Sequence, residues 1–576
     1  MSNNSLSRRK MFDLVQTQLE SERTSFLTHW QELSDFIAPR RARIKDWDTN
    51  RGDKRNQNII DSTGTMSLRT LRSGMMSGVT SPARPWFKLT LSDPELSEYG
   101  RVRQWLDAVT ARMNTVFLRS NLYNVLPIIY GDMGLFGTGA MAIEEDLNGN
   151  VFNFVPFQIG SYSVAQGPNL KVDTFNRKFR MTARQMVEKF GIKDPNYPMK
   201  INWSIFSQSV KDAYDKGQFE QWFDVTHFIR PNELYKPNNP FAKYKKYTSC
   251  YYEHSTSNNA QTDLFLRESG YDYFPILCPR WEINGEDVYG TSCPGMEALG
   301  DVKQLQVGEK RSLQAVDKMI NPPLTAPTAM RNSKVTLMPG DINYVDVREG
   351  LQGIRSVYDI NFRINELEQK QAQCRTRIQR AFFEDLFLML ASSDRRQITA
   401  REIEERHEEK LLALGPVLEQ LNQDLLDPLI DNCFKIMQKQ RLLPPPPPEI
   451  AGADMKIEYI SIMAQAQKMV GIGAVERFSG FVAQVANIDQ TVLDKVNADS
   501  LVDVYSDLTS VPSKILRTED EVKSIRGQRA QAQQQAQQQQ TMMAGAKVAK
   551  DLSGATLADD NALAAMMKGG VVPNGL

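Results

Sequence analysis

The 576-residue sequence lacks several features that would point to a particular class of protein. It carries no net charge, because 69 basic side chains balance 69 acidic ones. This balance excludes a strongly basic coat protein for nucleic acid, so any contact with DNA must come from local clusters of charge. The hydrophobic content of 41% and the charged content of 24% are those of an ordinary globular protein. The length predicts about four domains, or one large chain folded into several regions.

Cysteine and long apolar runs are also scarce. The five cysteines lie far apart and form no C-x-x-C pair, which argues against a disulfide framework and a zinc site and predicts reduced thiols. The most apolar stretch, 125–143, is interrupted by Asp132 and four glycines, and the N-terminus has no apolar segment typical of a signal peptide. We therefore expect no membrane insertion and folding in a cytoplasm-like environment.

Known catalytic patterns are missing as well. The sequence has no phosphate-binding P-loop. His407 and Glu408 begin like a zinc-protease helix, but Leu411 stands where the second histidine is required. The glycines in 134–139 have the wrong order for dinucleotide binding and predict close helix packing instead. None of the four histidines has a triad or metal partner nearby in the sequence, so we predict no catalytic site, no cofactor and no bound metal.

The first half of the sequence predicts a helix followed by a β-rich region. Apolar residues recur every three or four positions from Phe12 to Ile37, which predicts an amphipathic helix that ends before Pro39. In the basic stretch that follows, 40–55, aspartates are interleaved, so a solvated loop fits it better than a nucleic-acid patch. Short alternating runs rich in aromatic residues, proline and asparagine predict strands and long loops over 151–289.

Helical patterns dominate the second half. Apolar stripes predict one helix at 296–320 and another from about 361 to 390, with strand-like pieces around the Pro339-Gly340 turn between them. This arrangement projects a small β module away from the rest of the chain. A polar interruption at 391–397 precedes a helix of over thirty residues, in which Gly415-Pro416 and Pro428 predict kinks rather than breaks. The fold class is therefore α+β, mainly helical.

The last part of the sequence is lower in complexity. Five prolines at 444–448 form a stiff spacer, which is followed by a predicted strand at 455–460. Helical sequence continues to about residue 529. The Gln-rich stretch at 528–540 and the Ala/Gly/Met-rich tail that ends at Leu576 fit either a fraying helix or a disordered segment.

Five stretches, taken together, resemble the portal proteins, which are the head-to-tail connectors of short-tailed, T7-like bacteriophages. They span most of the chain in the expected order, and the length fits the family. The stretches are SGMMSGVTSPARPWFKL at 73–89, YGDMGLFGTG at 130–139, VTHFIRP at 225–231, FPILCPRW at 274–281 with GEDVYG at 285–290 and Pro294-Gly295, and VPSKILRTEDEV at 511–522.

The resemblance implies a phage portal fold with wing, stem, clip and crown regions, assembled as a dodecameric ring. It assigns 1–295 to the wing, 296–320 and 361–390 to the two stem helices, and 321–360 to the clip between them. It assigns 391–399 to a tunnel loop, 400–462 to a long kinked wing helix and a strand, and 463–527 to the crown. The Gln/Ala-rich tail, 528–576, is either an extension of the crown as a helical barrel or a disordered segment.

The implied function is that of the ring at the unique capsid vertex. Such a ring is a conduit for double-stranded DNA during genome packaging and ejection, and it nucleates head assembly with the major capsid and scaffolding proteins. It docks the large terminase and later a tail adaptor protein. It is a virion component assembled in the host cytoplasm and not an enzyme. Two other classes stay open: a virion-associated hydrolase whose site assembles only in three dimensions, and a monomeric DNA-binding or scaffolding protein.

The candidate DNA contacts are Asp394, Arg395 and Arg396 in the tunnel loop. A conduit must guide DNA without holding it, because each phosphate that Lys or Arg neutralises strengthens binding. In a twelvefold ring the two arginines would place twenty-four positive charges around the channel, partly offset by the aspartates. A plain solvated turn between helices is the alternative.

The predicted stem helices carry balanced charge and apolar stripes. We expect their charges to form salt bridges between subunits rather than to grip phosphate; these residues are Lys303, Glu309, Lys310, Arg311, Asp317 and Lys318. The apolar stripes cannot be buried within a lone hairpin, so we expect neighbouring subunits to cover them. Phe382, Phe383 and Phe387 are expected to be packing residues near the tunnel loop.

Overall fold

A computed structural model describes most of the chain. The described residues are 8–320, with gaps within 42–53, 94–98, 147–150, 193–200 and 255–263, together with 322–325, 331, 355–356, 364–392, 414–450, 455–460, parts of 475–505, and 519–553. Their fold is a mixture of helices and antiparallel sheets, as the α+β prediction requires.

The N-terminal part of the chain is mostly helical. The predicted first helix is confirmed as α1 (Arg8–Ile37), and it is followed by α2 (Thr63–Val79), α4 (Gly100–Arg119) and α5 (Leu122–Phe136). The indole nitrogen Nε1 of Trp30 donates to the carbonyl oxygen of Phe136 at 3.1 Å, and the ring lies in the main core. The apolar face of α1 is thereby fixed to the end of α5.

The β-rich region predicted for 151–289 is confirmed and forms two antiparallel sheets. One sheet has the order β4-β5-β6-β7-β8, and the other has the order β3-β2-β9. The strands of the larger sheet are β4 (Tyr162–Gln166), β5 (Val172–Thr182), β6 (Trp222–Pro231), β7 (Tyr247–Glu253) and β8 (Arg267–Tyr271). Those of the smaller are β2 (Met141–Asp146), β3 (Val151–Pro156) and β9 (Ile276–Leu277). Between β5 and β6 lie the short helix α6 (Ala183–Met186), a π-helical turn (Val187–Gly191) and α7 (Gln208–Asp215).

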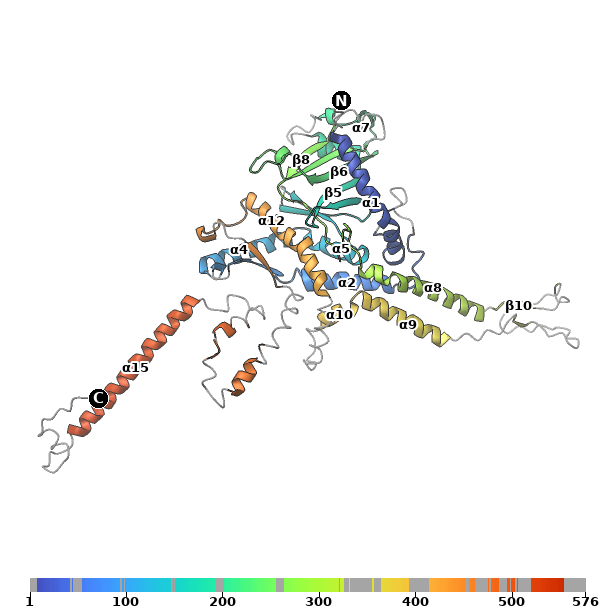
Figure 1. Ribbon diagram of the computed structural model, residues 1–576. Coiled ribbons are helices and arrows are strands. Elements are labelled where there is room, and N and C mark those ends of the chain that lie inside the picture. Colours follow the sequence, from blue (N-terminus) through green and yellow to red (C-terminus); the bar gives the residue numbers. More distant parts are fainter. Residues whose placement is uncertain are drawn as a thin grey trace, which may run out of the picture.

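Two long helices project from this body. They are α8 (Pro294–Ile320) and α9 (Ile364–Ala381), and they run side by side away from the sheets (Figure 1). Near their far end, β10 (Leu324–Thr325) pairs with β11 (Arg355–Ser356) in antiparallel register. The first helix confirms the prediction at 296–320. The strand-like pieces around Pro339-Gly340 lie outside the described residues.

The second predicted helix, 361–390, is two helices rather than one. After α9, the backbone of Phe383 takes a φ of 55°, and α10 (Glu384–Ser392) begins at the next residue. The reason is packing: the turn lets both Phe382 and Phe387 be buried in the core, which a straight helix would not align. α10 includes the first two residues of the predicted polar interruption at 391–397.

The long helix predicted after residue 399 is described from Leu414 onward. Helical turns at 414–421 lead into a π-helical turn (Asn422–Leu426) and then α12 (Asp427–Lys439), so the helix is distorted but not broken. Pro428 lies directly after the π-helical turn. This agrees with the predicted kink, because proline has no N–H for the helical ladder.

The strand predicted at 455–460 is confirmed as β12 (Met455–Tyr459). It pairs with β1 (Phe87–Leu91), nearly 370 residues earlier in the chain, with Leu89 opposite Ile457. This pairing closes the body by joining the segment after the polyproline run to α2 and α4.

The Gln-rich stretch is helical. α15 (Glu519–Ser553) contains all of 528–540, which favours the helical alternative for that stretch. In Figure 1 this helix lies apart from the body. One tertiary contact of α15 is an ion pair near its start, where Arg526 Nη2 lies 2.7 Å from Asp499 Oδ1. Residues 554–576 lie outside the described part of the chain.

Candidate functional site

The paired helices α8 and α9 are joined to each other and to the body by ion pairs. Arg375 on α9 is central: its Nε lies 2.9 Å from Asp61 Oδ2, and its Nη2 lies 2.5 Å from Glu309 Oε1 on α8. Arg377 Nη2 lies 2.7 Å from Asp301 Oδ1. These pairs fix the register of the two helices over the half that is nearest to the body.

The apolar stripe of α8 changes character along its length. In the half near the body, Leu299, Val302 and Leu305 are buried in the main core. In the far half, Leu313 is 62% exposed and Ile320 is 79% exposed. The far half therefore presents an apolar face that the described part of the chain does not cover.

Two of the six charged residues predicted for contacts between subunits have partners within the chain. Lys303 Nζ lies 2.7 Å from Glu32 Oε2 on α1, and Glu309 pairs with Arg375 as described above. The other four form no ion pair among the described residues; they are Lys310, Arg311, Asp317 and Lys318. Pairing of these four between subunits stays a prediction.

The turn between α9 and α10 is fixed by close packing on α2. A Cβ at Gly74 would lie 2.1 Å from Cγ of Phe387, so only glycine allows this approach. Ser67 Oγ donates to Glu384 Oε2 at 2.8 Å. Phe382 and Phe387 are buried and Phe383 is half-buried against Trp281, which confirms the prediction that these phenylalanines are packing residues. The family-like stretch at 73–89 thus supports the segment that leads toward the predicted tunnel loop.

The structure describes the chain up to the start of the predicted tunnel loop. α10 ends at Ser392, and Asp394, Arg395 and Arg396 lie outside the described residues. Their role as DNA contacts stays a prediction.

Two of the family-like stretches meet in space. A Cβ at Gly137, whose φ is +80°, would lie 2.1 Å from the carbonyl oxygen of Gly290. Gly290 N donates to Thr138 Oγ1 at 2.8 Å, and Trp281 N donates to the Gly137 carbonyl oxygen at 2.8 Å. The glycines in 134–139 therefore serve close packing, as predicted, and they place the start of α8 against the end of α5.

A buried ion pair that sequence reasoning missed joins the body to the kinked helix. Arg280 is 1% exposed, and its Nε lies 2.9 Å from Oδ2 of Asp424 in the π-helical turn. The same guanidinium donates to Gln166 Oε1 at 3.2 Å and to the Leu170 carbonyl oxygen at 2.8 Å. Arg280 lies in the family-like stretch at 274–281, but nothing in the sequence pointed to Asp424, which is 144 residues away.

One arginine of the basic stretch at 40–55 departs from the solvated-loop prediction. Arg41 pairs with Asp132, which is fully enclosed within α5. Burial raises the pKa of Asp132 to about 6, against the opposing charges of Arg41 and Arg72. The ion pair with Arg41 thus explains why an aspartate interrupts the apolar stretch 125–143: Asp132 anchors the chain after α1 on α5.

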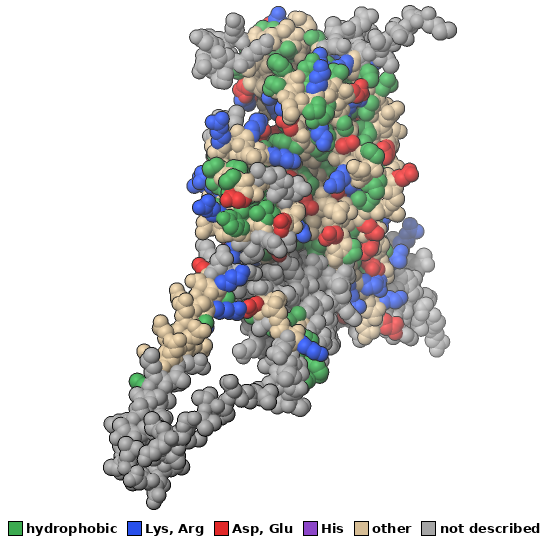
Figure 2. All heavy atoms as spheres, turned by 60° about the vertical axis from the view of Figure 1, so that its left-hand side comes forward, with side chains coloured by type: hydrophobic (Ala, Val, Ile, Leu, Met, Phe, Trp, Pro, Cys, Tyr) green, Lys and Arg blue, Asp and Glu red, His purple; other side chains and the backbone are tan. Residues whose placement is uncertain are grey.

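Over the part of the chain that the structure describes, the cysteines and the possible metal ligands form neither a disulfide nor a metal site. All five cysteines are free and buried, and no group of three His, Cys, Asp or Glu among the described residues is placed to hold a metal ion. Within the same residues, no helix is both long and apolar enough to span a membrane. Basic and acidic side chains are interspersed over the face seen in Figure 2.

Comparison with known proteins gives a consistent result. Residues 9–516 match the family model described as bacteriophage head to tail connecting protein. The chain is 46% identical over 556 residues to the portal protein of Salmonella phage epsilon15, covering 96% of this chain and 97% of that protein. It is 42% identical over 546 residues to the probable portal protein of Bordetella phage BPP-1, covering 95% of each.

A solved structure of the virion of a native gene transfer agent particle is similar at 11% identity, with a TM-score of 0.33 and coverage of 77% of this chain and 89% of that one. That likeness is too weak to support an argument about the fold. The family match and the two phage relatives each cover most of the chain. The chain therefore belongs to the bacteriophage head-to-tail connecting proteins, the portal proteins.

Proposed function

We propose that this protein assembles into the ring at the capsid vertex and serves as a conduit for double-stranded DNA during packaging and ejection. The observation that carries the proposal is the similarity to two phage portal proteins over at least 95% of the chain. The same proposal makes it a virion component that docks the large terminase and later a tail adaptor, and that nucleates head assembly with the capsid and scaffolding proteins.

The paired helices α8 and α9 support the ring. An exposed apolar face on the far half of α8 is costly in water, and burial by a neighbouring copy would remove that cost. Core burial of Leu299, Val302 and Leu305, together with the ion pairs of Arg375, holds the near half of the pair against the body. We propose that α8 and α9 with α10 are the stem, at 296–320 and 361–390, and that twelve copies form the ring.

The other regions are assigned in the same way. We propose 1–295 as the wing with 400–462, 321–360 as the clip, 463–527 as the crown and 528–576 as its extension. The β10–β11 pair at the far end of the stem supports a clip module there, and the helix α15 supports a helical extension of the crown.

Electron microscopy of the purified full-length protein tests the ring. We expect rings with a central hole, and compact monomers at high protein concentration would overturn the proposal. Leu313→Asp on the exposed face is expected to abolish the rings, whereas Leu118→Asp, at an exposed leucine of α4 that is 58% exposed, is the matched control. If Leu118→Asp abolished the rings and Leu313→Asp did not, this result would contradict the assignment of α8 to the subunit interface.

The tunnel loop is tested separately. We propose that Arg395 and Arg396, offset by Asp394, contact DNA at the constriction of the channel. Replacing both arginines with alanine is expected to reduce packaging or retention of DNA in infected cells while rings still form. Unchanged packaging and retention of DNA would instead support the alternative, that this loop is a plain solvated turn.

The hydrolase alternative has one feature in its favour, which does not suffice. His227 Nε2 lies 2.9 Å from Ser249 Oγ, a Ser–His contact of the kind that a hydrolase needs. Ser249 is fully buried, however, and is not among the residues that line the cavity beside His227. Its hydroxyl cannot reach a substrate in this fold, and the two phage relatives are portal proteins.

A further inference from the structure

A row of polar side chains crosses the larger sheet. Direct cross-strand partners follow one another from strand to strand: Tyr162 on β4, Arg177 on β5, His227 on β6, Tyr251 on β7 and Arg267 on β8. Directly opposed residues point to the same face of a sheet. The larger sheet therefore carries two arginines and a histidine on the face that is turned toward the smaller sheet.

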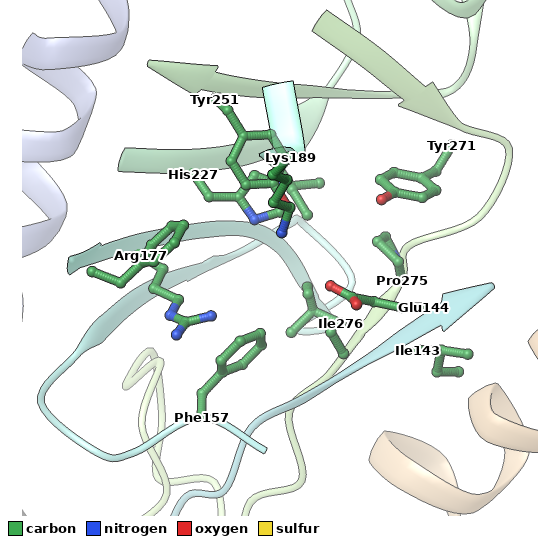
Figure 3. A pocket seen from close by; sticks show the side chains of 13 residues that line it. Ile143, Glu144, Phe157, Arg177, Lys189, His227, Tyr251, Tyr271, Pro275 and Ile276 are labelled. Carbon is green, nitrogen blue, oxygen red and sulfur yellow. The ribbon is translucent and has the colours of Figure 1, made fainter. Parts of the chain in front are cut away.

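A small, partly open cavity lies over the middle of this row. Its volume is about 40 Å³, and Figure 3 shows Arg177, His227 and Tyr251 on one side with Glu144 of β2 reaching in from the other. Lys189, from the π-helical turn after α6, also lines it. One water molecule takes up about 10–15 Å³ of such a cavity volume. The cavity therefore has room for about three waters or one small oxyanion, and it is too small for a nucleotide.

The two cations that line the cavity, Arg177 and Lys189, form no direct ion pair with any described residue. The Nε of Arg177 is buried and has no hydrogen-bond partner, and no ion pair of this guanidinium occurs among the described residues. It is instead held between the rings of Phe157 and Phe179, with its Cζ 4.6 Å and 4.5 Å from their centroids. Lys189 lies with its Nζ 5.3 Å from the ring centroid of Tyr251 and likewise forms no ion pair in the described part of the chain.

Among the residues that line the cavity, one carboxylate, Glu144, faces the two cations; its charge acts on both of them but balances only one. Glu144 is exposed and forms no described ion pair with either cation. Burial, with the charges of Arg177, Lys189 and Arg267, holds the pKa of His227 well below its usual range, so the ring is neutral near pH 7. Burial raises the pKa of Tyr251 and Tyr271, so both are neutral as well. A buried N–H such as that of the Arg177 Nε is costly without an acceptor, and a bound anion would supply one.

We propose that this cavity is a binding site for a small tetrahedral oxyanion such as phosphate or sulfate, held by Arg177 and Lys189. The guanidinium offers directed N–H donors, and the ammonium adds a second charge, which is the usual chemistry of oxyanion recognition. The bound ion would join β5 to the π-helical turn after α6, the two elements that carry its cationic ligands.

The test uses the purified full-length protein with inorganic phosphate as the probe. At matched ionic strength, phosphate is expected to raise the unfolding temperature, followed by tryptophan emission, relative to chloride, because a ligand of the folded state stabilises it. Isothermal titration then gives the affinity. No stabilisation by phosphate beyond that by chloride would overturn the site, and a larger effect of acetate than of phosphate would overturn the tetrahedral ligand.

Variants separate this site from general salt effects. Lys189→Gln, at an exposed position that should not disturb folding, is expected to weaken phosphate binding at least tenfold, and Arg177→Gln to abolish it. Lys216→Gln, at the exposed end of α7, is the control and should bind phosphate like the unmodified protein. Equal weakening of phosphate binding in Lys216→Gln would overturn the proposal. If Arg177→Gln fails to fold, the phosphate affinity of Lys189→Gln alone tests the proposal.

Glu144→Gln distinguishes an external anion from an internal counterion. If the site binds an oxyanion, removing the carboxylate is expected to tighten phosphate binding severalfold, because it removes a repulsive charge. If Glu144 is the true counterion of Arg177 and Lys189, the variant would instead lose stability and gain no affinity. That result would overturn the proposal.

Discussion

The sheet-containing body and the projecting helix pair are stabilised in different ways. In the body, two of the buried charges form ion pairs, Arg280 with Asp424 and Arg41 with Asp132, and the core is continuous from Trp30 to Ile450. In the helix pair, burial ends about halfway along α8, and beyond it apolar and charged side chains lie in solvent. The body can complete its core alone, whereas the far half of the helix pair cannot.

This difference shows where a partner is needed. Apolar surface left by folding is available to association, and in a closed ring the same face of each subunit can be covered by its neighbour. Substitutions in the body should therefore change the free energy of unfolding. Those in the far half of α8 should change assembly. All seven tryptophans precede α8 in the sequence, so their emission during urea unfolding reports on the body.

The largest effect is expected at Gly137. Gly137→Ala would press a Cβ against the backbone oxygen of Gly290 in a backbone conformation that disfavours side chains, and should cost about 4 kcal/mol of unfolding free energy or prevent folding. Gly217→Ala is the matched control, because its φ is +72° with nothing within 4 Å, and it should cost only about 1 kcal/mol. Similar losses in the two variants would show that close packing between the two family-like stretches does not matter.

A smaller loss is expected at the buried ion pair. Arg280→Met leaves the Asp424 carboxylate buried without its partner and should cost about 3 kcal/mol, measured by urea unfolding. Arg377→Met, which breaks the more exposed pair with Asp301 in the helix pair, should give no resolvable shift in the urea midpoint. Equal losses of unfolding free energy in the two variants would mean that the ion pairs of the body stabilise the fold no more than those between α8 and α9.

Two leucines of α8 compare its halves directly. Leu305→Ala removes a side chain that is 1% exposed and should cost about 2–3 kcal/mol, because it leaves a cavity in the main core. Leu313→Ala, at a position that is 62% exposed, should change the unfolding free energy by less than about 0.5 kcal/mol. The same Leu313 variant should weaken ring assembly, measured by sedimentation. A stable, fully assembled Leu313→Ala protein would argue against the exposed face as an interface.

The smallest effect is a pH dependence in the body. Burial raises the pKa of Asp132 to about 6, above the value near 3.9 of an unfolded aspartate. A group whose folded pKa is raised stabilises the fold at low pH and loses that contribution as pH rises from about 4 to 6. In Asp132→Asn, the urea midpoint should change less with pH between about 4 and 6 than it does in the unmodified protein. An unchanged pH profile would assign the dependence to other groups.

Local patterns predicted the elements well and their joints less well. The periodicity of apolar residues was sufficient for α1 and α8, because a helix that buries one face must repeat every three to four residues. It missed the turn at Phe383, because the apolar spacing continues through it and only the position of the core decides which phenylalanine is buried. It also assigned Arg41 to a solvated loop, since nothing nearby in the sequence indicates that Asp132 is enclosed.

The candidate site, too, could be predicted from the sequence only in part. The sequence predicted the helix pair and its balanced charges, but it could not show that Lys303 and Glu309 find partners on α1 and α9. The polar row across the larger sheet was not predicted, because Arg177, Lys189 and Glu144 belong to separate elements. Their approach depends on strand register and on how the two sheets pack.

The sequence by itself determined the family, the order of the main helices and the β-rich region, and the absence of net charge. These follow from composition, periodicity and stretches of residues that are local in the chain. Only the tertiary structure decided that β1 pairs with β12, that Arg280 meets Asp424, and that α8 is buried along one half and exposed along the other. Such contacts join residues far apart in the chain, and they are fixed by the packing of whole elements rather than by any local pattern.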